Sequence, residues 1–236
     1  MFRKMKKPGL AGFVLMGLFI NATRVFGRTG DRWYENPLGF EPVKLHSGMG
    51  FLLPAAAVGA CLMFTSREAR SGSAISIYNE SGFSWGYKEP HTFLAQNDSG
   101  VNIHLRRWMS IGAELDAYFP RDRFNRTFGL AIRLFARFYP VNTDRWKLYF
   151  ESGGGIVCFL DRFPKPTPDD PRLGTRINGT TKYGLGSQIR FSRKTSVLFG
   201  VRHVHISNAN ARGIERNPSH DSNGLYLGFS HVIGSE

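Results

Sequence analysis

Apolar and polar residues alternate along the chain from about residue 72 onwards. In the segment 108–119, for example, Leu115 and Phe119 share one face of an extended chain, whereas Glu114 lies on the other, because successive side chains of a β-strand point to opposite sides. This period of two predicts β-strands. An apolar face with charges opposite suits a membrane barrel that meets lipid outside and has a polar interior. A soluble sandwich, with its apolar face inside, produces the same alternation, so the pattern alone leaves both architectures open.

Eight segments show this pattern, and single-chain outer-membrane barrels of bacteria have an even number of strands. Each is long enough to cross a bilayer as a tilted strand. The connections alternate between short and long, and the longer ones are rich in Pro, Asp, Asn and Gly. Because such barrels have short periplasmic turns and longer outer loops, the two chain ends of the barrel domain are predicted to lie in the periplasm. The predicted strands are residues 74–86, 97–105, 108–119, 127–139, 146–160, 178–191, 196–208 and 221–232.

Two apolar segments precede the predicted barrel domain, which we place at residues 72–233. Residues 1–27 have the pattern of a secretory signal peptide, since basic residues come before an apolar run from Leu10 to Ile20. That run is short for a membrane span. Residues 49–64 form a second apolar run, which is either the true leader, if translation begins at Met49, or an N-terminal helix. In both cases we expect an exported protein.

The composition adds a prediction about partners. The formal net charge of +13 indicates an anionic partner, either nucleic acid or an anionic lipid surface. An aromatic content of 14% and 27 glycines suit a barrel with aromatic girdles and tight turns better than a nucleic-acid module. The two cysteines, Cys61 and Cys158, form neither a disulfide framework nor a metal-ligand cluster. We therefore expect membrane lipids as partners, and neither nucleic acid nor a metal.

Candidate chemistry lies at the outer end of the seventh predicted strand, where His205 and Ser207 share a face. If the pleat of the eighth strand continues back from Leu225, Asp221 lies on the equivalent face. A serine, a histidine and an aspartate are the attacker, the base and the group that orients the base in an activated serine nucleophile. His203 shares this face too, but a metal site would need a third ligand to which the sequence does not point. A Ser and a His at this spacing also occur by chance in many strands.

The residues around this site carry a family resemblance. It rests on the runs His205-Ile206-Ser207-Asn208-Ala209, Asn217-Pro218 and Asp221-Ser222-Asn223-Gly224-Leu225-Tyr226-Leu227-Gly228. Together they resemble the signature of the PagL-type lipid A deacylases, which are also called acyloxyacyl hydrolases. The resemblance is dense over residues 200–229 and looser back to about residue 72. It implies an all-β protein, an eight-stranded antiparallel outer-membrane β-barrel, that acts as an esterase without a cofactor.

The resemblance also implies residue roles. Its His-x-Ser-Asn motif falls on His205 as base and acid, Ser207 as nucleophile, and Asn208, which with nearby backbone N–H groups would form the oxyanion hole. The acidic member is often Glu in the family, whereas this chain has Asp221, which shortens the reach by one methylene. The interval from Ser207 to Asp221 is also longer than the family leads us to expect, which leaves Glu215 as a second candidate for the acidic residue. Strand parity places the site on the outer face, toward the leaflet that holds lipid A.

The sequence therefore predicts an outer-membrane enzyme that hydrolyses an ester-linked acyl chain of lipid A in lipopolysaccharide. The resemblance alone implies the 3-position. An outer-membrane phospholipase with the same residues remains an alternative, as does a structural or adhesive barrel in which His205 and Ser207 are incidental. Association of copies into a homo-oligomer is also left open. In a predicted outer loop, Arg121, Arg123 and Arg126 are candidates for contacts with lipid A phosphates, although a solvated loop is the simpler interpretation.

Overall fold

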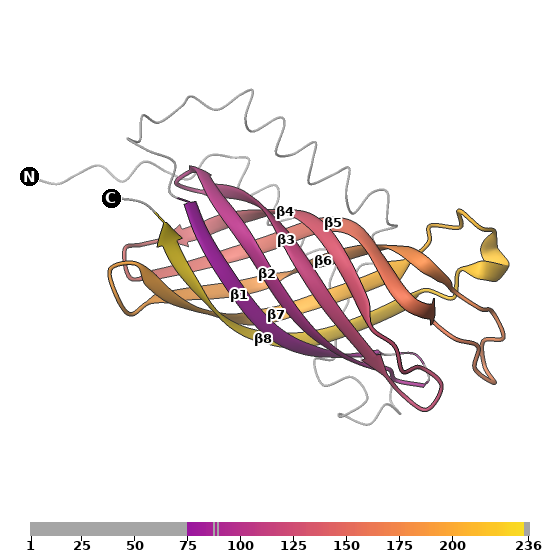
Figure 1. The fold of residues 1–236 in the computed structure, drawn as a ribbon. Helices are drawn as coiled ribbons and strands as arrows, with labels where there is room; N and C mark the ends of the chain where they lie inside the picture. Colours follow the sequence, from indigo (N-terminus) through magenta and orange to yellow (C-terminus); the bar gives the residue numbers. More distant parts are fainter. Residues whose placement is uncertain (1–74, 87, 89, 234–236) are drawn as a thin grey trace, which may run out of the picture.

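The chain forms a closed barrel of eight antiparallel strands (Figure 1). The computed structural model describes residues 75–86, 88 and 90–233. Every strand pairs with its neighbours in chain order, and β8 pairs with β1 to close the barrel. The predicted architecture is thus confirmed, while both predicted leader segments lie outside the described residues. The elements are β1 (Ile75–Gly86), β2 (Phe93–Arg106), β3 (Met109–Arg121), β4 (Gly129–Asn142), β5 (Trp146–Phe163), β6 (Thr175–Arg190), β7 (Thr195–Ser207), the short helix η1 (Ile214–Arg216) and β8 (His220–Ile233).

Some strands are longer than the sequence predicted. β2 begins at Phe93 instead of residue 97, and Phe93 pairs with Trp85 of β1. The prediction missed residues 93–96 because Phe93, Leu94 and Ala95 are all apolar and show no alternation. In this barrel, Leu94 and Gln96 are both buried, so an apolar and a polar residue share the inward face.

The outer face of the barrel is apolar along its middle, as expected for a lipid-facing surface. Leu115, Ile132, Ile156 and Leu227, on four different strands, are between 58% and 66% exposed. Aromatic rings pack together near both ends, as Phe83 does with Trp85 at the outer end of β1. A soluble protein rarely exposes so continuous an apolar band. This band, together with the closed barrel, identifies a protein of the bacterial outer membrane. In the described part of the chain, no helix is both long and apolar enough to cross a bilayer.

The interior of the barrel is filled and is not an open pore. Apolar side chains close it near the outer end, among them Leu94, Phe159 and Ile206, and a second apolar group lies toward the opposite end. Between them lies a network of buried charges. It consists of the acidic side chains Glu80, Asp98, Glu114, Asp116 and Glu151 and the basic side chains Arg133, Arg137, Lys182 and Arg202.

Lys182 shows how this network satisfies its charges. Its ammonium group lies 2.9 Å from Asp98, 2.6 Å from Glu114 and 3.1 Å from Asp116. Those three carboxylates are close enough together to hold a cation, and Lys182 is the cation that they surround. Since each acidic group comes with a basic partner, the interior can remain charged and buried.

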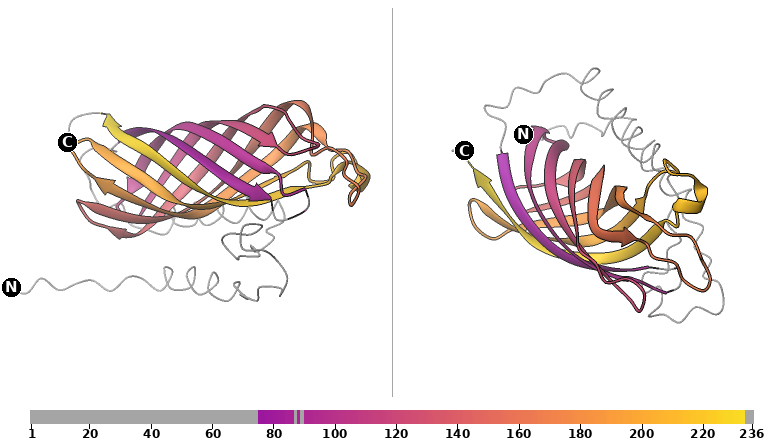
Figure 2. Two further views of the ribbon diagram at one scale, coloured as in Figure 1. Left: turned by 90° about the horizontal axis from the view of Figure 1, so that it is seen from below. Right: turned by 45° about the vertical axis from the view of Figure 1, so that its right-hand side comes forward.

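The longer connections gather at one end of the barrel, opposite the C-terminal end of β8 (Figure 1, Figure 2). They comprise residues 122–128, 164–174 and 208–219, together with the connection between β1 and β2. Arg172 donates to the carbonyl of Asn217 at 3.2 Å, and Arg216 donates to the carbonyl of Leu173 at 3.1 Å, so two of these loops are joined. The topology rule for such barrels places this end outside the cell.

Candidate active site

The register of three strands brings the candidate residues together. His205 on β7 is the direct cross-strand partner of Asp221 on β8 and of Thr181 on β6. Ser207 follows two residues later on the same face of β7 and pairs with Gly179 of β6. No long loop is needed to assemble the site, because neighbouring strands of a sheet hold directly opposed side chains within reach.

Ser207, His205 and Asp221 form a continuous hydrogen-bonded chain. The Oγ atom of Ser207 lies 2.9 Å from Nε2 of His205. The Nδ1 atom of the same ring lies 2.6 Å from Oδ1 of Asp221. A carboxylate accepts hydrogen bonds only, so Nδ1 carries a hydrogen and Nε2 of the neutral ring is free to accept the serine proton. This is the order of contacts that a serine nucleophile requires.

The three side chains point away from the interior, as strand parity predicted. The alternate residues Arg202, Val204 and Ile206 are buried in the barrel. The side chain of His205 is 18% exposed and that of Asp221 is 7% exposed, although both lie on the outer face. Neighbouring side chains on that face therefore cover the carboxylate while leaving part of the imidazole open.

Asp221 has two further basic neighbours. The Nε2 atom of His203 lies 3.5 Å from Oδ1 of Asp221, and Nζ of Lys88 lies 3.9 Å from its Oδ2. Neither contact follows from the sequence, in which His203 is a candidate only for metal binding. The face that His203 shares with His205 was visible in the strand parity, whereas the approach of Lys88 depends on the connection between β1 and β2.

Glu215, the second acidic candidate, lies in η1 on the outer loop and is exposed. The carboxylate that the structure brings to His205 is that of Asp221. The longer interval after Ser207 is taken up by the loop 208–219, which leaves the cross-strand pairing of His205 and Asp221 intact.

Asn208 is engaged in holding this loop. Its side-chain amide donates to the carbonyl of Arg216 at 2.5 Å and to Oγ1 of Thr175 at 3.3 Å. Its backbone N–H donates to Oδ1 of Asn217 at 3.0 Å. The structure therefore does not present these N–H groups to an oxyanion, in contrast to the expectation for Asn208, because the loop already uses them.

The backbone turns sharply directly after Asn208. Ala209 and Asn210 have φ values of 51° and 61°, in the left-handed region that non-glycine residues rarely adopt. The N–H of Asn210 donates to Oδ1 of Asn208. Within the described part of the chain, the N–H of Ala209 has no acceptor, which makes it the nearby backbone donor still open to an oxyanion.

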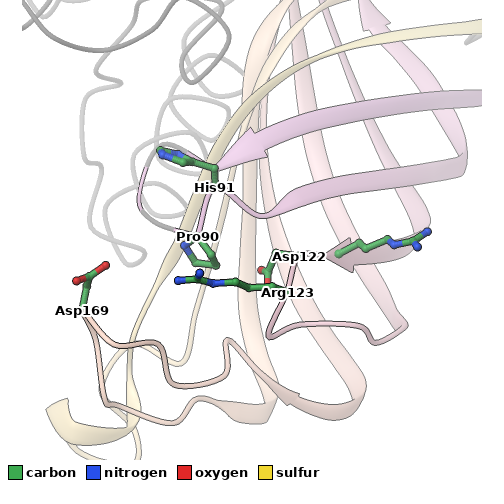
Figure 3. Close-up of a pocket in the computed structure, with 6 residues that line it drawn as sticks. Pro90, His91, Asp122, Arg123 and Asp169 are labelled. Atoms are coloured by element: carbon green, nitrogen blue, oxygen red, sulfur yellow. The ribbon is translucent and has the colours of Figure 1, made fainter.

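A polar depression of about 570 Å³ lies at the same end of the barrel (Figure 3). It is lined by residues of the β1–β2 connection, the β3–β4 loop and the β5–β6 loop, including Arg121, Arg123 and Asp169.

Asp122 accepts hydrogen bonds from the N–H groups of Phe124 and Asn125, which fixes the β3–β4 loop. In the β5–β6 loop, the hydrogen bond from Arg172 lowers the pKa of the Asp170 carboxyl below its ordinary value.

Comparison with solved structures returned small outer-membrane barrels. The crystal structure of the outer membrane enzyme PagL is 15% identical and has a TM-score of 0.46, covering 66% of this chain and 99% of that one. Neisserial surface protein A is 10% identical with a TM-score of 0.47, and covers 70% and 100% of the two chains. The N-terminal barrel domain of Pseudomonas aeruginosa OprF is 14% identical with a TM-score of 0.42, and covers 67% and 99%. Because these similarities are low, the fold assignment rests on the strand pairing itself.

A sequence comparison with curated proteins found no match. The comparison with family models found one, to the family described as Lipid A 3-O-deacylase (PagL), over residues 123–230. The matched region includes Ser207, His205 and Asp221 and extends from the β3–β4 loop into β8. The resemblance inferred from the sequence is therefore confirmed, and over residues 123–230 this chain matches the PagL family of lipid A 3-O-deacylases.

Proposed function

We propose that this protein is an outer-membrane serine esterase that removes an ester-linked acyl chain from lipid A. The observation that carries the proposal is the chain of contacts from Ser207 through His205 to Asp221 on the outer face of the barrel. The family match supports lipid A as the substrate and the 3-O-acyl chain as the position. The charged interior and the apolar exterior support this proposal, because residues on the outer face near the outer end of the barrel can meet a lipid of the outer leaflet.

The proposed reaction has two steps. Ser207 attacks the ester carbonyl while Nε2 of His205 takes the hydroxyl proton, and the resulting tetrahedral oxyanion collapses to expel the sugar hydroxyl, which receives that proton. The acyl group is then bonded to Ser207. Water attacks this acyl-enzyme, again with His205 as base, and releases the fatty acid. Asp221 keeps Nδ1 of His205 protonated and stabilises the imidazolium that forms in each step.

We assign the oxyanion hole to the backbone at Ala209. Its N–H follows Ser207 by two residues and has no acceptor among the described residues, and the left-handed conformation of Ala209 turns the chain here. In this assignment, Asn208 acts indirectly, because its hydrogen bonds to Arg216 and Asn217 hold the loop that carries the donor. A pre-oriented backbone N–H needs no rearrangement when the oxyanion develops.

The surface beside Ser207 is open to an acyl chain. Gly179 lies directly opposite Ser207 on β6, and a Cβ atom there would have only two backbone carbonyl oxygens within 4 Å, the nearer at 3.3 Å. Beyond it, Ile156 and Ile177 are 66% and 64% exposed. An acyl chain can therefore lie along an apolar surface with its ester next to Ser207, without leaving the membrane.

A phospholipase and a non-catalytic barrel are the alternatives that the test must separate. The purified, folded protein would be incubated with mixed micelles that contain either lipid A or a diacyl phospholipid, and released fatty acid would be measured for the wild type and for Ser207→Ala. We expect release from lipid A only, and only with Ser207 present. Release from phospholipid would establish the phospholipase, while equal background for both chains on both lipids would indicate a non-catalytic barrel.

A further inference from the structure

The outer face next to the candidate triad carries a second histidine with a defined environment. His203 precedes His205 by two residues on β7, and its side chain is only 7% exposed. Its ring packs against that of Tyr183, its direct partner on β6, with centroids 4.8 Å apart. Its Nδ1 atom lies 2.9 Å from Oδ1 of Asn223, its direct partner on β8. These contacts from both neighbouring strands fix the orientation of the ring.

This orientation directs the other ring nitrogen at the catalytic carboxylate. Nε2 of His203 lies 3.5 Å from Oδ1 of Asp221, the same oxygen that lies 2.6 Å from His205. The shorter contact makes His205 the main partner, and the longer one is at the outer limit of a hydrogen bond. If the amide of Asn223 is turned over, its NH2 group replaces Oδ1 and donates to Nδ1 of His203. The ring hydrogen of His203 then lies on Nε2, which can donate it to Asp221.

We propose that His203 is a positioning residue, a second N–H donor that holds the carboxylate of Asp221 in the orientation His205 requires. The proposal rests on the proposed function of the triad. A carboxylate on a short Asp side chain can rotate about its bonds, and one hydrogen bond alone fixes only one of its oxygens loosely. With a second donor on the same oxygen, that oxygen stays on the side that faces His205. His203 itself makes no contact with the nucleophile.

Two substitutions separate the hydrogen bond from the packing of the ring. His203→Phe keeps an aromatic ring against Tyr183 but has no N–H donor. His203→Gln loses the ring but places a side-chain amide N–H at about the distance of Nε2. Asn223→Ala tests the same arrangement indirectly, because it frees Nδ1 of His203 while leaving every member of the triad in place. Because these side chains lie on the outer surface, folding of each variant is checked first by its heat-dependent mobility on SDS gels.

The readout is the rate at which Ser207 reacts with a fluorophosphonate. In that reaction Oγ bonds to phosphorus, fluoride leaves, and His205 takes the serine proton, so the rate reports activation of the nucleophile whatever the natural lipid is. Loss of one hydrogen bond to a charged group predicts a fall of about tenfold for His203→Phe. We expect His203→Gln to recover most of the rate and Asn223→Ala to fall between them. On a lipid substrate, kcat should fall while KM stays unchanged.

Two results would overturn the proposal. One is a wild-type rate for His203→Phe. The other is a rate for His203→Gln as low as that of His203→Phe, because the ring and not its N–H would then be what matters. A wild-type protein that labels at Ser207 but leaves lipid A intact would refute the proposed substrate and not the role of His203. Absence of labelling at Ser207 in the folded wild type would refute the triad and this proposal together.

Discussion

His205 and Asp221 are direct cross-strand partners on β7 and β8, and their Nδ1 and Oδ1 atoms lie 2.6 Å apart. The sheet register alone creates this contact. The two strands are joined by the loop 208–219, yet the position of the carboxylate does not depend on the path of that loop. The candidate site is therefore as rigid as the barrel wall.

Asp221→Asn should lower kcat by about 10³- to 10⁴-fold, because an amide can present an N–H to His205 and favour the wrong tautomer. Glu215→Gln is the matched control, since it makes the same chemical change on the exposed helix η1. We expect Glu215→Gln to keep wild-type kcat. The two variants would be compared by fatty-acid release from lipid A micelles. A large loss of kcat in Glu215→Gln, with wild-type kcat in Asp221→Asn, would identify Glu215 as the acidic residue of the triad.

Substitutions at Gly179 should act by size. A Cβ atom at this position would lie 3.3 Å from the carbonyl oxygen of Ser207 and 4.0 Å from that of Gly155, so Gly179→Ala requires little adjustment. Gly179→Leu would fill the surface beside Ser207 where we place the acyl chain. We expect Gly179→Ala to keep most of kcat/KM for lipid A and Gly179→Leu to lose most of it. Equal activity of both folded variants would show that the acyl chain does not bind beside Gly179.

Lys182→Met should destabilise the barrel strongly. It leaves Asp98, Glu114 and Asp116 without the ammonium group that they surround, and removing one partner of a buried ion pair costs about 3–5 kcal/mol. Lys194→Met, at an exposed position between β6 and β7, is the control and should change the free energy of unfolding by less than about 0.5 kcal/mol. Urea unfolding in lipid vesicles would measure both. Similar values for the two variants would show that the network adds little to stability.

Arg121 and Arg123 line the depression at the outer end of the barrel, and Figure 3 labels Arg123 there. If they meet phosphate groups of lipid A, replacing both with Gln should raise KM for phosphorylated lipid A while leaving kcat unchanged, because the charge lost is remote from the ester. Lipid A that lacks its phosphates should show no such difference. An unchanged KM for the phosphorylated substrate would assign these arginines to a solvated loop.

Most of the barrel could be predicted from the sequence because one periodicity recurs in every strand. Leu115 and Glu114 are assigned to opposite faces by parity alone, and the structure leaves Leu115 exposed and buries Glu114. The start of β2 could not be predicted. Phe93, Leu94 and Ala95 are all apolar and do not alternate, and only the pairing with β1 shows that Leu94 belongs to a strand and lies inside the barrel.

At the candidate site too, some features follow from the local sequence pattern and others depend on contacts between distant residues. His205, Ser207 and Asp221 follow from parity on two strands, whereas the contacts of Asn208 depend on the loop that ends at Asn217. No local pattern indicates that this loop uses the N–H groups of Asn208. The contact between His203 and Asp221 likewise requires the register of β7 against β8, which the sequence leaves undetermined.

The central claim is that Ser207 removes an ester-linked acyl chain from lipid A. The most direct measurement is mass spectrometry of lipid A from a Gram-negative host that expresses either the wild-type chain or Ser207→Ala, with equal amounts of folded barrel in the outer membrane. The account predicts that lipid A loses the mass of one ester-linked acyl chain only in cells with the wild-type protein. Unchanged lipid A in both strains, or the same loss in both, would contradict it.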